Sequence, residues 1–224
     1  IRVNVHGGEF VSGIKPRMLS GDFGEGSYAA FGELRKKSVS IPSARFDIAI
    51  LGDDNVAMGD DNVALWVERS GKAVAQLWGR FSVDRTAIFV CPVNAEEVVF
   101  GKVLSLGGPA VAAFMGTSMR PEDIPKDWVL IHEMIHLGFP TFLGEGRWLG
   151  EGVATYYEPI LRGRAGYRDP KTIWKAFAQD MPRAIPRGKE LALEKRYDVD
   201  SIYWGGAFFV LLADVRIRQE TKGQ

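Results

Sequence analysis

Two histidines stand four residues apart in the segment 132–136 (His-Glu-Met-Ile-His), within an otherwise apolar stretch of the chain. Residues four apart lie on one face of a helix, so the imidazoles of His132 and His136 can reach a single metal ion if this segment is helical. The spacing is typical of a zinc site in which the intervening glutamate, here Glu133, accepts a proton from water rather than binding the metal. The motif therefore requires a helix and predicts a metal-dependent hydrolytic site on it.

The residues around the motif favour both the helix and the metal. A helix is predicted over about 122–138, because Glu122 and Asp123 suit its first turn and Gly138 and Pro140 suit its end. The same pattern also occurs by chance on helices that bind no metal. Against chance, the chain has only 3 histidines and two of them stand here. A polar trio among apolar neighbours would also be costly to bury without a partner.

A catalytic zinc ion of this kind takes three ligands from the protein and keeps one position open. Glu151 is the best-placed third ligand, because it lies in the first turn of a helix predicted over 149–161. Glu145 competes with it but lies between two glycines in a predicted loop, and Glu158 follows two turns later and is expected to face elsewhere. The alternative role for Glu151 is a carboxylate that stabilises a helix N-terminus.

The segments 132–136 (HEMIH) and 148–158 (WLGEGVATYYE) together resemble the gluzincin metallopeptidases, in particular the glycyl-aminopeptidase-like and aminopeptidase-N-like families. Those families carry HExxH on one helix and take a glutamate ligand from the next. The resemblance implies that Glu151 completes a zinc site with the two histidines of the motif. It also implies that Glu133 is the general base.

A second resemblance to these families lies near the C-terminus, where the segment 201–207 (SIYWGGA) is similar to their YxKGA helix. It implies that Tyr203 donates a hydrogen bond to the oxyanion of the tetrahedral intermediate. The chain departs from the families in three places. The spacing between the second histidine and Glu151 is shorter, Gly205 stands where they have lysine, and no GxMEN segment, with its amine-binding glutamate, precedes the motif.

The pattern along the whole chain predicts an α+β fold. Strands are expected at 2–6, 44–50, 86–91, 97–106 and 110–115, and further helices at 62–78, 149–161, 170–180 and 200–219. We expect a β-rich N-terminal subdomain over 1–61. The resemblance implies a thermolysin-like zincin catalytic domain, a small mixed sheet with a helical lobe, over 62–224. Asn62 should cap the first helix and Gly79 should end it. The strand at 110–115 is expected at the edge of the sheet, where it could pair with an extended substrate.

Composition argues against several kinds of partner. The 28 basic and 28 acidic side chains give a formal net charge of zero, which favours neither nucleic acid nor an anionic membrane. No apolar run approaches the roughly 20 residues that cross a bilayer. Cys91 is the only cysteine, so an internal disulfide is impossible, and its apolar neighbours suit a buried side chain better than a nucleophile. A removed signal peptide would explain a start without methionine, so we expect a bacterial envelope, periplasmic or secreted location rather than a cytoplasmic one.

Taken together, these features predict a zinc-dependent peptidase with one Zn²⁺ and a peptide or protein substrate. Two alternatives stay open: an inactive gluzincin-fold module that binds peptides or proteins, and a zinc hydrolase of a non-peptide substrate. A serine or cysteine hydrolase is disfavoured, because only His6 lies outside the motif and no G-x-S-x-G segment is present. Thr155 and Asp214 are candidates for orienting the histidines. The cleavage position and the oligomeric state are not predicted.

Overall fold

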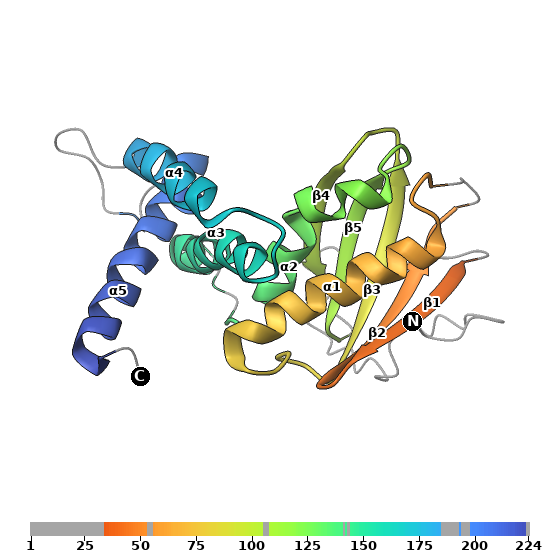
Figure 1. The fold of residues 1–224 in the computed structure, drawn as a ribbon, viewed down its shortest axis with the longest axis horizontal. Coiled ribbons are helices and arrows are strands. Elements are labelled where there is room, and N and C mark those ends of the chain that lie inside the picture. The colour runs from red at the N-terminus through yellow and green to blue at the C-terminus, as the bar shows by residue number, and fades with distance from the viewer. Residues whose placement is uncertain are drawn as a thin grey trace. The chain divides into compact units, whose positions relative to one another are not determined.

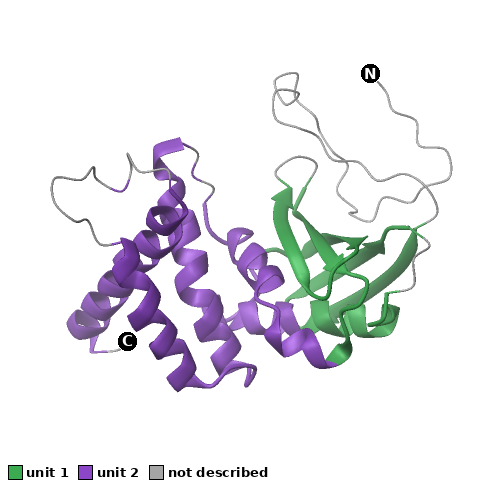
Figure 2. Cartoon of the chain, turned by 90° about the horizontal axis from the view of Figure 1, so that it is seen from above, with its two compact units in different colours: residues 1–68, 83–121 green, residues 69–82, 122–224 purple. Residues whose placement is uncertain are grey.

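The computed structural model describes residues 34–52, 56–104, 108–140, 142, 144–184, 193 and 198–222. The chain divides into two compact units, one of residues 1–68 and 83–121 and the other of residues 69–82 and 122–224 (Figure 2). Helix α1 (Asp60–Trp78) runs from the first unit into the second. The predicted boundary between residues 61 and 62 falls at the start of this helix, and the predicted strand at 2–6 lies outside the described residues.

The first unit is built on a five-stranded mixed sheet in the order β1-β2-β3-β5-β4 (Figure 1). Its strands are β1 (Arg35–Ile41), β2 (Ala44–Ile50), β3 (Arg85–Val93), β4 (Val98–Leu104) and β5 (Ala110–Gly116). Strands β2, β3 and β5 run parallel, and β1 and β4 are antiparallel to their neighbours. The strands predicted at 44–50, 86–91 and 110–115 are confirmed, and β4 confirms residues 98–104 of the strand predicted at 97–106.

The interior strands are apolar on both faces, as expected for parallel strands that are covered on both sides. In β2, Ile48, Ala49 and Ile50 are consecutive and fully buried. The first turns of α1, which belong to the first unit, bury Val63 and Trp66 completely. These residues form the core of the first unit.

Helix α1 begins two residues before the predicted cap. Asp60 occupies its first turn, where a carboxylate stabilises the helix N-terminus, and pairs with Arg35 of β1 at 3.0 Å. The prediction of Asn62 as the cap is wrong, because this residue lies inside the helix and donates a hydrogen bond from its side chain to the Met58 carbonyl at 2.9 Å. Gly79 follows the last residue of the helix with a positive φ of 74°, which confirms the predicted stop.

The prediction that 110–115 forms an edge strand is wrong. Strand β5 pairs with β3 on one side and with β4 on the other, so β1 and β4 are the edges of the sheet in the part of the chain that the structure describes. Six of the seven residues of β5 are buried, whereas β4 exposes Val99 and Phe100 by 54% and 53%. An apolar strand with both faces buried suits the interior of a sheet, and the more exposed β4 lies at its edge.

The second unit is helical apart from its loops. Its elements are the 3₁₀ helix η2 (Pro121–Lys126), α2 (Val129–His136), η3 (Gly144–Gly146), α3 (Arg147–Arg164), α4 (Pro170–Asp180), η4 (Met181–Ala184), the π-helix η6 (Asp200–Gly205) and α5 (Gly206–Thr221). The helices predicted at 149–161, 170–180 and 200–219 are confirmed. Among the described residues, none of the helices has the length and apolar character needed to cross a membrane.

The helix predicted over 122–138 is divided into η2 and the shorter α2. Pro125 lies within η2 and has no N–H to donate to an α-helical ladder. Asp127 then starts α2 by accepting hydrogen bonds from the backbone N–H groups of Val129 at 3.0 Å and Leu130 at 3.3 Å. The HExxH segment therefore lies on a helix of eight residues that is held at its first turn by a buried carboxylate.

Candidate metal centre

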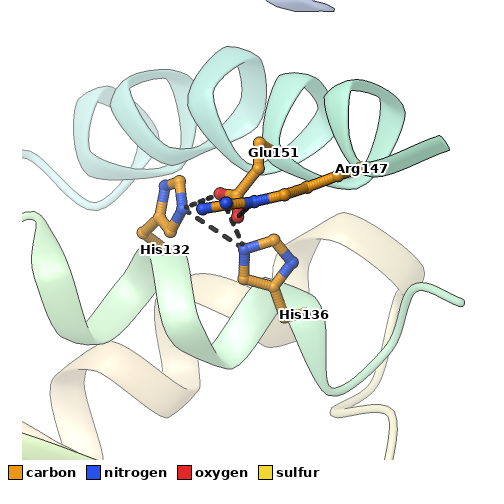
Figure 3. Close-up of polar contacts among 4 residues, drawn as sticks. All are labelled: His132, His136, Arg147 and Glu151. Carbon is orange, nitrogen blue, oxygen red and sulfur yellow. Dashed lines mark hydrogen bonds and ion pairs between the residues drawn. The ribbon is translucent and has the colours of Figure 1, made fainter. Parts of the chain in front are cut away.

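Three side chains of the second unit converge on one point. His132 and His136 project from the same face of α2, and Glu151 reaches them from α3 (Figure 3). Nε2 of His132 is 3.2 Å from Nε2 of His136 and 3.2 Å from Oε2 of Glu151, and the third side of the triangle, from His136 Nε2 to Glu151 Oε2, is 3.4 Å. The structure thus brings together the three residues that the sequence suggested as ligands.

This triangle fits a tetrahedral zinc ion. With zinc about 2.0–2.1 Å from each ligand atom, the ligand atoms of a regular tetrahedron lie about 3.3–3.4 Å apart. The chemistry of the donors agrees, since two imidazole nitrogens and one carboxylate oxygen are a known ligand set for catalytic zinc, with a fourth position left open. In the part of the chain that the structure describes, these three residues are the group of histidine, cysteine or acidic side chains close enough to hold an ion.

The centre is mostly shielded from solvent. The side chains of His132, Glu151 and His136 are exposed by 4%, 15% and 21%. Burial by itself would raise the pKa of the Glu151 carboxyl, but hydrogen bonds to both histidines outweigh it and hold this pKa well below its usual range. Glu151 is therefore a carboxylate at neutral pH and can act as an anionic ligand.

Tyr203 lies beside the histidines on an unusual helix. It belongs to the π-helix η6, whose wide turns often occur at functional sites, and its ring stacks on that of His132 with centroids 6.0 Å apart and planes at 22°. Burial and the charge of Glu151 raise the pKa of Tyr203, and the charge of Glu133 acts in the same direction. Tyr203 and Glu133 thus lie close enough to interact at the same centre as the three candidate ligands.

The competing glutamates lie outside the triangle. Glu145 is exposed and lies in the 3₁₀ helix η3 rather than in the loop that its glycine neighbours predicted. Glu158 is buried and pairs with Arg162 at 3.1 Å, and burial raises the pKa of Glu158 to about 7. The two residues suggested as orienting groups differ from expectation: Asp214 accepts hydrogen bonds from Tyr156 and Arg218 instead, and Thr155 Oγ1 has no partner among the described residues.

Three residues around the centre were not anticipated. Asp127 caps α2, and an acidic residue just before an apolar run was a signal that could have found it. Arg162 of α3 donates to the carbonyls of Pro125 and Lys126, both at 2.9 Å, and so joins α3 to the segment before α2. Arg147 lies 3.4 Å from Oε1 of Glu151. The contacts of Arg162 join segments that no local pattern connects, whereas Arg147 and Glu151 are four residues apart on α3.

Comparison with known proteins gives similarity at the level of fold. No protein-family model and no curated protein matches the sequence. Among solved structures, an aminopeptidase N family protein from Idiomarina loihiensis is similar with a TM-score of 0.60 at 14% identity, over 86% of this chain and 39% of that one. An M1 zinc metallopeptidase from Deinococcus radiodurans has a TM-score of 0.47 at 18% identity, over 78% of this chain and 38% of that one, which is too distant to carry an argument.

At such low identity the first of these matches shows the fold alone. The described elements form a mixed α/β fold similar to part of an aminopeptidase N family protein, and the chain spans 39% of the length of that protein.

Proposed function

We propose that this chain contains the catalytic centre of a zinc-dependent peptidase, with His132, His136 and Glu151 as the metal ligands. The triangle of ligand atoms with sides of 3.2, 3.2 and 3.4 Å carries this proposal, because its size and donor set suit tetrahedral zinc. The similarity in fold to an aminopeptidase N family protein supports a peptide substrate. On this view the sheet and the helices belong to a thermolysin-like catalytic unit.

The proposed chemistry divides between two further side chains. A bound zinc ion would polarise the scissile carbonyl and lower the pKa of a water molecule. Glu133, which follows the first ligand on α2, accepts the proton of the attacking water and later passes it to the leaving amine. Tyr203 donates its phenolic hydrogen to the oxyanion that develops on the carbonyl oxygen. That hydrogen is in place at neutral pH, because the ordinary pKa of tyrosine is already near 10 and burial raises the pKa of Tyr203 further.

The proposal covers peptide-bond hydrolysis but commits to no cleavage position. The sequence has no GxMEN segment to supply a glutamate for the free α-amine of a substrate. No residue is therefore assigned to bind the free α-amine that an aminopeptidase recognises. Cleavage within a peptide chain is equally compatible with the centre. The cleavage sites in a peptide mixture decide between the two.

The test compares the wild type with Glu133→Gln on a mixed peptide library, with zinc content measured on the same samples. We expect chelator-sensitive cleavage in the wild type and loss of cleavage in the variant without loss of zinc, because Glu133 is assigned to the proton and not to the metal. Zinc without cleavage in the wild type would favour a binding module or a hydrolase of another substrate. Unchanged cleavage by Glu133→Gln would remove the assigned mechanism.

A further inference from the structure

Arg147 contacts two different parts of the proposed centre. Its Nε lies 3.4 Å from Oε1 of Glu151, the carboxylate oxygen that is not in the triangle with the histidines. It also interacts with Tyr203: burial raises the pKa of this tyrosine, and the charge of Arg147 and a hydrogen bond from it act in the opposite direction. Figure 3 shows the side chain reaching along α3 to the Glu151 carboxylate. One arginine therefore contacts both the proposed third ligand and the proposed oxyanion donor.

The position of Arg147 runs against the electrostatics of its own helix. Arg147 is the first residue of α3, where the helix dipole favours acidic side chains and disfavours cations, and the first turn of α3 carries no acidic residue. Residues that contradict a local preference are found mainly at functional or strained sites. The contacts with Glu151 and Tyr203 provide a reason for a cation at this place.

The chemistry of arginine fixes the roles of both partners. A guanidinium has five N–H donors and no acceptor, so Tyr203 can only accept from it. A phenol that accepts through its oxygen has its single O–H left to donate to another acceptor. In Glu151, Oε1 accepts from Arg147, and Oε2 is the oxygen that faces the two histidines. Arg147 thus contacts one oxygen of the carboxylate, while the other oxygen lies with the histidines.

We propose that Arg147 is a positioning residue that couples the third metal ligand to the oxyanion donor, by holding Oε1 of Glu151 and directing the O–H of Tyr203 into the site. This inference rests on the proposed function, because both partners take their roles from it. The competing interpretation is an exposed ion pair between residues four apart on a helix, a type of contact that contributes little to stability.

The chain offers a matched control for that competing interpretation. Arg218 pairs with Asp214 four residues away, and the exposed fractions of the two side chains are 54% and 16%, against 55% and 15% for Arg147 and Glu151. Asp214 also shares its carboxylate with a tyrosine, Tyr156. Arg218→Ala therefore removes an equivalent ion pair that has no contact with the proposed ligands.

The experiment is a double-mutant cycle with Arg147→Ala, Tyr203→Phe and the combined variant, assayed at saturating zinc on a peptide that the wild type cleaves. We expect Arg147→Ala to lower kcat about tenfold or more in the wild-type background, with little change in KM, and less than about twofold in the Tyr203→Phe background. Arg218→Ala should change neither kcat nor KM.

Zinc affinity, measured by competition with a chromogenic chelator, provides a readout that does not depend on catalysis. Arg147→Ala should weaken zinc binding about tenfold, as is usual for loss of a group that orients a ligand, and to the same extent in both backgrounds. Arg147→Lys should restore the affinity, because it keeps a cation beside Glu151. It should not restore kcat, because a compact ammonium does not hold two acceptors in a fixed geometry.

Two results would overturn the inference but not the proposed peptidase function. One is that Arg147→Ala lowers kcat equally in the wild-type and Tyr203→Phe backgrounds. The other is that the Arg147→Ala protein binds zinc as tightly as the wild type. In each case the wild type still binds zinc and cleaves the peptide. A wild type that neither binds zinc nor cleaves peptides would instead remove the proposed function, and the role of Arg147 with it.

Discussion

Gly152 of α3 and Gly206 of α5 lie against each other through their backbones. A Cβ on Gly152 would stand 2.3 Å from the carbonyl carbon of Gly206, and a Cβ on Gly206 would stand 2.2 Å from the carbonyl oxygen of Trp148. Gly152 directly follows Glu151, and Gly206 comes three residues after Tyr203. The close approach of these two helices therefore sets the separation between the proposed third ligand and the proposed oxyanion donor.

Gly206→Ala should disturb this approach. Because the clash is with backbone atoms that cannot rotate away, we expect the free energy of unfolding to fall by about 1–3 kcal/mol or more. Chemical denaturation measures this value. The matched control is Gly150→Ala in α3, where a Cβ meets nothing within 4 Å and where alanine favours the helix. If the two variants were equally stable, the helices would not pack through these glycines.

Arg162→Ala should destabilise the second unit strongly. The substitution removes two hydrogen bonds to the segment before α2 and leaves Glu158 buried without its cation, which typically costs about 3–5 kcal/mol at a pH where Glu158 is ionised. Thermal or chemical unfolding measures the loss. Arg216→Ala is the control, because this arginine pairs with Glu220 on the surface and should contribute less than about 1 kcal/mol. Equal losses would show that Arg162 has no special role.

The pH dependence of stability should carry a contribution from Glu158. Burial outweighs the attraction of Arg162 and raises the pKa of Glu158 from an ordinary 4.5 to about 7. The folded state therefore binds the proton more tightly, and the contribution of Glu158 to the free energy of unfolding should decline as the pH rises from about 4.5 to 7. The free energy of unfolding is measured against pH, without metal, for the wild type and for Glu158→Gln. The difference between the two profiles isolates this decline. A flat difference would contradict the raised pKa.

Tyr203→Phe should separate metal binding from catalysis. Loss of one oxyanion donor usually lowers kcat about 10²- to 10³-fold. Zinc content should stay at the wild-type level, because Tyr203 is not one of the three residues that form the triangle of ligand atoms. Steady-state kinetics with elemental analysis of the same sample measures both. A variant with wild-type kcat would remove Tyr203 from the mechanism.

Local patterns predicted most of the elements but not their arrangement. The helices that carry His132 and Glu151, and the apolar strands, follow from periodicity within a few neighbouring residues. The order of strands in the sheet depends on pairing between distant segments, so the interior position of β5 was missed. The break before α2 depends on Pro125 and on the cap formed by Asp127. Both are local features, but the pattern over 122–138 was interpreted as one continuous helix.

The candidate site shows the same division. The histidine pair is a local spacing, and the resemblance to a known helix pair suggested Glu151 and Tyr203. Arg147 and Arg162 carry no comparable signal, because arginine is common on helix surfaces and each of these two also depends on a partner from another element. Arg162 reaches carbonyls 36 and 37 residues away along the chain, and Arg147 reaches Tyr203 from the start of α3.

The most direct test of the account is the zinc content of the purified wild type and of Glu151→Ala, after both are supplied with zinc and passed over a desalting column. Glu145→Ala is the control, because this glutamate is exposed in η3 and lies outside the triangle. The account predicts close to one zinc ion per chain in the wild type and in Glu145→Ala, and a sharp fall in Glu151→Ala. A wild type without zinc, or a Glu151→Ala protein that keeps it, would contradict the account.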